Sequence, residues 1–278
     1  MRTLLQATAV AAVLCVVSPV LFAQWPLYPT PNVPRASNGE PNLEGPVPRT
    51  ADGNPDLSGL WERFGPGGIT PSLESLQSPG GGPPAATFWN LGAGVAEGLP
   101  FRPLAAQLRA ERMSNNQKNN PDALCLPMGL MQLHLHPQPR KIVQTADVIV
   151  IMYEGNSGLR QIFTDGRPLP EVTEHLQPWW YGYSAGRWEG DTLVVETVGF
   201  RDDVWLDVQG SPMTNAGKMT ERFRRLNFGT LQIEITIEDP TAYTRPFTVR
   251  VNQRILLDED LIEFICNENE KSVRHFDP

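Results

Sequence analysis

The sequence has no excess of basic residues. Its 278 residues include 23 Lys and Arg against 31 Asp and Glu, and the formal net charge is −8. Proteins that bind nucleic acid or anionic membranes use clustered Lys and Arg to contact phosphate groups. The composition therefore argues against nucleic acid and against an anionic membrane surface as partners.

Motifs for nucleotides and cofactors are also missing. The sequence holds no G-x-G-x-x-G and no G-x-x-x-x-G-K, and helices are not predicted to alternate with strands. Ser184 lies between Gly182 and Gly186, but the segment is not predicted to form the strand-to-helix turn that holds a hydrolase nucleophile. We therefore expect no cofactor and disfavour a Ser-His-Asp hydrolase.

Histidine is scarce, with four residues in the chain. His134 and His136 stand on one side of a segment predicted to be extended, a spacing that can chelate Zn, Fe or Cu with a third ligand. The alternative is that both are surface or turn histidines before Pro137. His175 and His275 are the other two histidines. We favour the alternative and expect no metal site.

One long apolar run exists, at the start of the chain. Arg2 is followed by a mostly apolar stretch to Phe22, and Pro-rich sequence begins after Ala23. This pattern is typical of a cleaved secretory signal peptide over residues 1–23, with an uncleaved membrane anchor as the alternative. No later run approaches the roughly 20 apolar residues that span a bilayer. We expect a periplasmic or secreted protein without stable membrane insertion.

Two cysteines remain once the signal peptide is removed. Cys125 and Cys266 would lie in an oxidising compartment, where paired cysteines form disulfides. Two buried free thiols are the alternative. We predict a disulfide, which would close a long loop and stabilise the fold by about 4–5 kcal/mol.

Proline and glycine divide the mature chain. Residues 24–53 are rich in proline, which favours extended backbone, and we predict a tether there. One folded domain is predicted over residues 54–278, with a mobile Gly- and Pro-rich loop at 64–84. Residues 103–113 are predicted to form a helix.

Short β-branched runs begin near Lys141 and are separated by turn signals. Residues 148–153 are continuously apolar and are predicted to be a strand buried on both faces. Residues 231–237 alternate with period two, so one face is expected to lie against a core. Further strands are predicted at 159–164, 184–188, 192–198, 219–226, 247–255 and 261–266.

About eight strands in one antiparallel sheet must close or fold over to avoid a bare edge. The predicted fold class is therefore mainly β, an antiparallel meander that closes into a small lipocalin-like barrel, with one or two short helices. The disulfide would tie the segment before the meander to its final strand.

Carboxylates on apolar strand faces are candidates for chemistry. Glu196 and Glu221 both stand among apolar residues when alternate positions are counted along their predicted strands. An unpaired acid in a core has a raised pKa and suits general acid or base catalysis. An arginine from a neighbouring strand would instead make either acid a structural ion pair. Asp207 is a third candidate acid, and Tyr183 is a candidate to hold developing negative charge.

Aromatic residues gather over a short stretch near these acids. Adjacent Trp side chains cannot both point inward from a regular strand, so one is expected at a rim or loop. Aromatic rings at a barrel mouth offer flat surfaces for an apolar or aromatic ligand, and core filling is the alternative. The predicted ligand-binding residues are Arg167, Trp179, Trp180, Tyr181 and Trp205.

Several motifs occur together in this order: NPDLSGLW at 54–61, CLPMG at 125–129, GRWEGDTLVVETVGF at 186–200 and ERF at 221–223. Together they resemble a large, mainly uncharacterised family of secreted bacterial proteins, and the resemblance covers residues 54–269. That family often carries His where this chain has Leu169, Tyr183 and Met213. The resemblance implies an extracytoplasmic location and this architecture, and it implies no reaction.

The sequence thus favours a secreted or periplasmic barrel that binds a small apolar or aromatic molecule. The protein would be a carrier or a cofactor-independent lyase, isomerase or hydrolase that uses carboxylates for proton transfer. The alternative is a non-catalytic extracytoplasmic interaction module. An unpaired acid in a dry pocket would favour the enzyme, and a filled barrel would favour the interaction module.

Overall fold

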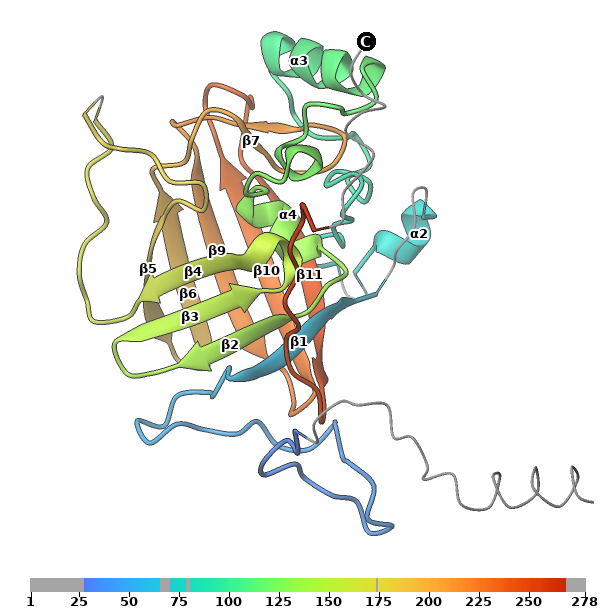
Figure 1. Ribbon diagram of the computed structural model, residues 1–278, viewed down its shortest axis with the longest axis vertical. Helices are drawn as coiled ribbons and strands as arrows, with labels where there is room; N and C mark the ends of the chain where they lie inside the picture. Colours follow the sequence, from blue (N-terminus) through green and yellow to red (C-terminus); the bar gives the residue numbers. More distant parts are fainter. Residues whose placement is uncertain (1–27, 66–70, 79–80, 174, 269–278) are drawn as a thin grey trace, which may run out of the picture.

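The structure, a computed structural model, describes residues 28–65, 71–78, 81–173 and 175–268. Nine strands form one closed sheet, so the predicted small β-barrel is confirmed (Figure 1). The predicted signal peptide lies outside the described residues. In sheet order the strands are β1 (Gly59–Phe64), β11 (Phe247–Leu256), β10 (Thr230–Glu238), β9 (Lys218–Arg225), β6 (Thr192–Val198), β5 (Tyr183–Glu189), β4 (Gly158–Phe163), β3 (Val148–Tyr153) and β2 (Arg140–Gln144).

Pairing of β1 with β2 closes the barrel. The pairs of neighbouring strands are antiparallel except β4 and β5, which run parallel. Ser184 near the start of β5 lies opposite Ile162 near the end of β4. The connecting chain therefore returns to the end of β4, and β5 continues from there in the same direction. A two-stranded ribbon, β7 (Val204–Trp205) with β8 (Pro212–Met213), lies outside the barrel sheet.

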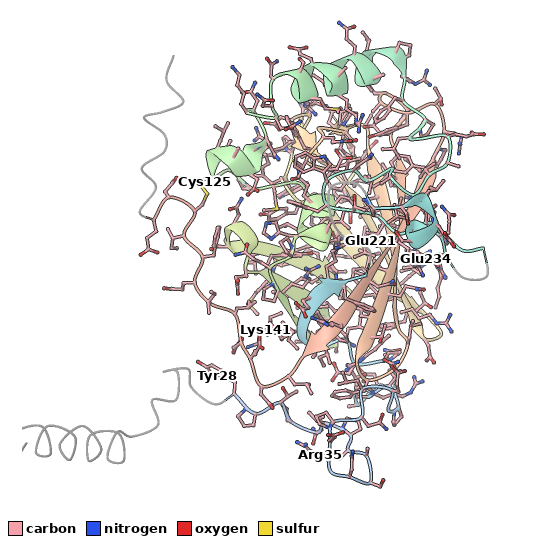
Figure 2. All side chains as sticks on the ribbon, turned by 90° about the vertical axis from the view of Figure 1, so that its right-hand side faces the viewer. Tyr28, Arg35, Cys125, Lys141, Glu221 and Glu234 are labelled. Carbon is pink, nitrogen blue, oxygen red and sulfur yellow. A yellow bond between two sulfur atoms is a disulfide. The ribbon has the colours of Figure 1, made fainter. Side chains whose placement is uncertain are left out.

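Alternate side chains of the strands fill the barrel. Leu231, Ile233, Ile235 and Ile237 of β10 are fully buried, as the period-two pattern predicts. These residues belong to a single hydrophobic core that also includes residues of the short helix α4 (Leu130–Leu135), all of which is buried. The barrel interior is therefore occupied by packed protein side chains (Figure 2).

Two strand predictions are wrong in detail. The sequence predicts β3 to be buried on both faces, but its residues alternate between buried and half-buried positions because its outer face is covered only in part. Residues 261–266 are predicted as the last strand but have no strand structure. They run as an extended segment, where the backbone N–H of Ile262 donates to Glu154 Oε2 at 3.1 Å. Lys141 of β2 pairs at 2.8 Å with Asp260, which directly precedes this segment.

The predicted helix is present as α3 (Pro103–Ser114), and two shorter helices are α2 (Leu73–Leu76) and α4. Leu104 of α3 is 79% exposed, so the leucines do not form its packed face. Ala105, Arg109 and Arg112 face the protein instead, at the four- and three-residue spacings of one helix face. Arg112 Nη1 donates to the Gly210 carbonyl at 2.9 Å, and Arg109 bonds to the Gln209 side chain.

The predicted tether packs against the barrel over its described part. The backbone N–H groups of Phe228 and Gly229 donate to the carbonyls of Gly45 and Leu43, and Arg49 pairs with Asp191 at 2.8 Å. Figure 1 shows residues 28–55 below the end of the barrel that lies opposite α3. In the predicted loop at 64–84, Ser72 caps α2, and Leu76 is fully buried. Residues 66–70 and 79–80 of that loop lie outside the described residues.

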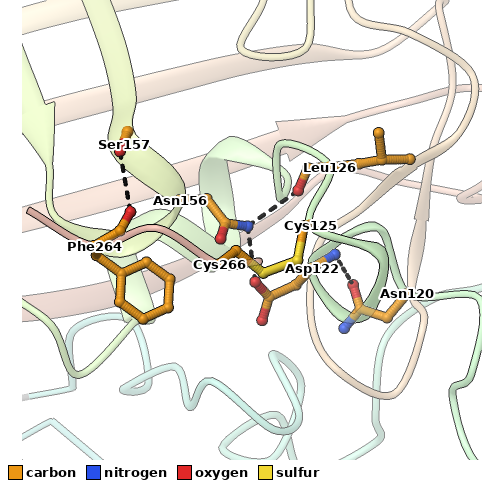
Figure 3. Close-up of a disulfide and its surroundings, with 8 residues drawn as sticks. All are labelled: Asn120, Asp122, Cys125, Leu126, Asn156, Ser157, Phe264 and Cys266. Carbon is orange, nitrogen blue, oxygen red and sulfur yellow. Dashed lines mark hydrogen bonds between the residues drawn. A yellow bond between two sulfur atoms is a disulfide. The ribbon is translucent and has the colours of Figure 1, made fainter. Parts of the chain in front are cut away.

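Cys125 and Cys266 form a disulfide, which confirms the predicted pairing (Figure 3). The bond joins the segment after the 3-10 turn at Pro121–Leu124 to the extended chain that follows β11, with 5.6 Å between the Cα atoms. Asn156 supports the junction because its amide donates to Asp122 and to the Leu126 carbonyl (Figure 3). Among the described helices, none is long and apolar enough to cross a membrane.

Candidate functional site

Glu221 lies in the barrel interior and is fully buried (Figure 2). Its carboxylate accepts hydrogen bonds from both terminal nitrogens of Arg160, one of them at 2.9 Å, and lies 2.7 Å from His134 Nε2. Arg160 also donates to Ser184 Oγ and to Thr197 Oγ1. The acid is therefore held in a buried ion pair, which is the structural alternative to a free catalytic acid.

The surroundings of Glu221 set its protonation. Burial alone raises the pKa of a carboxyl group, but the charge of Arg160 and the hydrogen bond with His134 outweigh it and lower the pKa of Glu221 to about 2. Burial lowers the pKa of His134, although Glu221 opposes that shift. Glu221 is therefore an ionised carboxylate at neutral pH and accepts hydrogen bonds from the groups around it.

Glu196 does not face the core, and its predicted orientation is wrong. The inward residues of β6 are Leu193, Val195 and Thr197, whereas the Glu196 side chain is 30% exposed on the outer face. It pairs there with Lys218 and with Arg187, the latter at 3.1 Å. The hydrogen bond from Lys218 lowers the pKa of Glu196.

Asp207 is fully buried and joins two loops. Its carboxylate accepts hydrogen bonds from the backbone N–H groups of Leu91 and Ser211 at 2.9 and 3.0 Å and from Ser211 Oγ at 2.8 Å. Burial raises the pKa of Asp207, and these hydrogen bonds oppose the rise. This pattern of contacts positions the loop after β7.

Tyr183, Trp179 and Arg167 belong to one stack on the outer wall of β4 and β5. The Tyr183 ring lies 5.3 Å from that of Phe163 and 5.6 Å from that of Trp179, measured between centroids. Arg167 lies 3.9 Å over Phe163 and donates to Tyr183 Oη at 3.4 Å. Rings and guanidinium thus cover one another. Tyr181 is separate from this stack and half-buried against the core, and this burial raises its pKa to about 12.

Trp180 and Trp205 meet at a different place, which we call the α3 cleft. This cleft has a volume of about 370 Å³ and lies between α3, the segment that carries Cys125, and the region of β7. Its apolar and aromatic lining consists of Leu108, Leu124, Leu126, Pro121, Trp180 and Trp205. Its polar lining consists of Glu111, Arg112, Asn115, Asn119 and Asp203.

The two tryptophans of the α3 cleft are each covered by an arginine. Arg112 lies 4.4 Å over the Trp205 ring, and Arg201 lies 4.4 Å over the Trp180 ring. Trp205 is buried, as the core-filling alternative for these aromatic residues predicts. The close approach of α4 explains its position, because Gln132 Nε2 donates to the Trp205 carbonyl at 3.0 Å. Gly129 of the CLPMG motif allows this contact, since a Cβ there would collide with the same carbonyl oxygen.

The histidine pair does not form a chelate. His134 and His136 lie in and directly after α4, not on an extended segment. His134 points to Glu221, and His136 packs edge-on against Phe88 at 5.2 Å. Within the described residues, no three His, Cys, Asp or Glu side chains gather as metal ligands.

The predicted site residues therefore occupy separate places. Trp180 and Trp205 share the α3 cleft, Arg167, Trp179 and Tyr183 share the outer stack, and Glu221 lies in the barrel. Arg112 and the leucines of the α3 cleft are absent from the residues predicted from sequence. The spacing along the helix could have identified Arg112, because Arg109 and Arg112 follow the buried Ala105 at helical intervals. The long apolar part of an arginine side chain covers apolar surface as leucine does.

No model of a known protein family, no curated protein and no solved structure matches this chain. Fold and geometry define it as a closed β-barrel protein with an aromatic cleft outside the barrel. The resemblance of its motifs to a family of secreted bacterial proteins stays a prediction.

Proposed function

We propose that this protein binds a small apolar or aromatic molecule in the α3 cleft and does so outside the cytoplasm. The observation that carries the proposal is the meeting of Trp180 and Trp205 in one cleft, because the sequence predicts both as ligand-binding residues. The disulfide supports the extracytoplasmic location, since oxidising compartments preserve such bonds.

The rim of the cleft supports an apolar ligand. Leu108, Leu124 and Leu126 line it and are 38%, 57% and 43% exposed, respectively. A ligand that covers them removes apolar surface from water, which is favourable by about 25 cal/mol per Å². The volume of about 370 Å³ lies in the size range of small-molecule sites. A compact aromatic compound would therefore fit this cleft.

The partners and positions of the candidate acids favour a ligand-binding function over catalysis by proton transfer. Glu221 is held by Arg160 and His134, and Asp207 accepts three hydrogen bonds. None of the three candidate acids, Glu196, Asp207 and Glu221, is among the residues that line the α3 cleft. We therefore favour a carrier role for the α3 cleft over the cofactor-independent lyase, isomerase or hydrolase.

The test compares two adjacent tryptophans. A neutral naphthalene probe, 2-naphthylmethanol, is titrated by calorimetry into the wild type, Trp180→Ala and Trp179→Ala. We expect Trp180→Ala to weaken binding at least tenfold, or about 1.4 kcal/mol, because an aromatic wall is lost. Trp179→Ala is the matched control, since Trp179 belongs to the outer stack. Equal effects of the two substitutions would contradict the proposal, as would failure of this probe and of its charged naphthalene analogues to bind the wild type.

The interaction module is a second candidate because of Leu104. This residue is 79% exposed on α3 and does not line the α3 cleft, so a small ligand would leave it uncovered. The packed barrel core is also what an interaction module would have. Native mass spectrometry of protein purified from its own host separates the two functions. A retained small molecule supports the binding protein, and a retained polypeptide supports the interaction module.

A further inference from the structure

Arg112 carries a partly buried positive charge in the wall of the α3 cleft. Its guanidinium donates to the Gly210 carbonyl at 2.9 Å and stacks on Trp205. A guanidinium has five N–H donors, so this bond leaves donors for another group. Among the described residues, no carboxylate comes within ion-pair distance of Arg112, although the charges of Asp207 and Asp203 act on it from farther away. Burial lowers the pKa of Arg112 to about 10, which still leaves it charged at neutral pH.

Two carboxylates also line the cleft, but they differ in their surroundings. Asp203 is already paired, because Arg201 donates to its two oxygens at 2.9 and 3.1 Å. Glu111 is exposed, so water and salt screen its charge. The charge of Arg112 is screened less, since burial lowers the local dielectric constant. An anion in the cleft would therefore gain more from Arg112 than it loses to Glu111.

We infer that the α3 cleft selects small aromatic anions, whose carboxylate binds Arg112 while the ring lies among the tryptophans and leucines of the cleft. This inference rests on the proposed function and adds the charge of the ligand to it. The ion pair would be charge-assisted and would use two parallel N–H donors of the guanidinium.

Three probes with the same ring system test the charge preference. They are 2-naphthoate, neutral 2-naphthylmethanol and cationic 2-naphthylmethylamine, each titrated by calorimetry at one fixed ionic strength. We expect the anion to bind at least tenfold more tightly than the alcohol, and the cation to bind most weakly. Arg112→Met is expected to remove the preference for the anion while the neutral alcohol still binds.

Replacement of the neighbouring Glu111 is expected to change the affinity for the anion in the opposite direction. Glu111→Gln removes a repulsive charge and is expected to tighten 2-naphthoate binding about two- to fivefold. It would leave the alcohol unaffected. Arg254→Gln is a matched control for the loss of a positive charge, because Arg254 is exposed on β11 and does not line the cleft. Its effect on the three probes is expected to be negligible.

The possible outcomes separate the inference from the proposed function. Equal affinity for anion and alcohol, or a preference for the cation, would overturn the inference and leave the proposed function standing. Failure of all three probes to bind the wild type would overturn both. If Arg112→Met does not fold, Arg112→Lys keeps the charge and is expected to keep the anion preference, and the Glu111→Gln result decides the sign independently.

Discussion

Replacement of Glu221 by glutamine tests whether the buried acid is structural. The carboxylate is fully buried and neutralises Arg160, which is equally buried. Glutamine keeps the shape but removes the negative charge, so the Arg160 guanidinium would be left in the core without a counter-charge. Removal of one partner of such a pair costs about 3–5 kcal/mol. The lowered pKa of Glu221 is consistent with this pairing, because burial alone would raise the pKa and the Arg160 charge outweighs that effect.

Urea unfolding of the wild type and the variant measures this loss. Glu196→Gln is the matched control, because Glu196 makes ion pairs on the outer wall and its loss is expected to cost less than about 1 kcal/mol. A free energy of unfolding for Glu221→Gln within about 1 kcal/mol of the wild type would refute this reasoning. It would show that the core tolerates an uncompensated Arg160, and the acid would again be a candidate for catalysis.

A paired substitution sharpens the same test. Arg160→Met together with Glu221→Leu removes both charges, and buried ion pairs replaced by apolar residues of similar volume are often near neutral in stability. We expect the double variant to be more stable than Glu221→Gln alone. Ser184 and Thr197, which bond to each other at 2.9 Å, would keep one hydrogen bond.

Three further predictions concern pH, the disulfide and α4. The pKa values of Glu221 and His134 are lower in the folded protein than in the unfolded chain, so the unfolded chain binds more protons as the pH falls. We therefore expect the folded protein to lose stability below pH 6.5 through His134. A further loss is expected from pH 4.5 toward 2 through Glu221. Thermal unfolding across this range measures it, and a Tm independent of pH would contradict it. Reduction of the Cys125–Cys266 disulfide is expected to cost about 4–5 kcal/mol, measured by unfolding with and without reductant, and an unchanged midpoint would oppose the prediction. Gly129→Ala places a Cβ against the Trp205 carbonyl and is expected to lower the free energy of unfolding by about 1–3 kcal/mol. Gly53→Ala is the control, because a Cβ there meets open space although φ is positive, and its loss of unfolding free energy is expected to be smaller. Urea unfolding of both variants checks this order, and equal losses would contradict it.

The sequence predicted the elements whose local patterns are unambiguous. Residues 231–237 alternate cleanly between apolar and polar side chains, and β10 follows that alternation. Helix α3 begins at Pro103, which suits the first turn of a helix. The cysteine count predicted the disulfide, because two cysteines remain once the predicted signal peptide is removed, and two cysteines have one pairing. In each case the information lies within a few residues of the chain or in a simple count.

Tertiary structure decided the orientation of Glu196 and the place of the cleft. Strand β6 has apolar residues on both faces, so its pattern does not say which face is inside, and the register Val195 opposite Glu221 settles it. Residues 261–266 are apolar enough for a strand, but the barrel closes between β1 and β2 and offers them no free edge. Trp180 and Trp205 become neighbours in the α3 cleft only because α3 and α4 pack beside β7. Such contacts join segments that are distant in sequence, and their geometry depends on the packing of the whole barrel. A local sequence pattern therefore does not predict them.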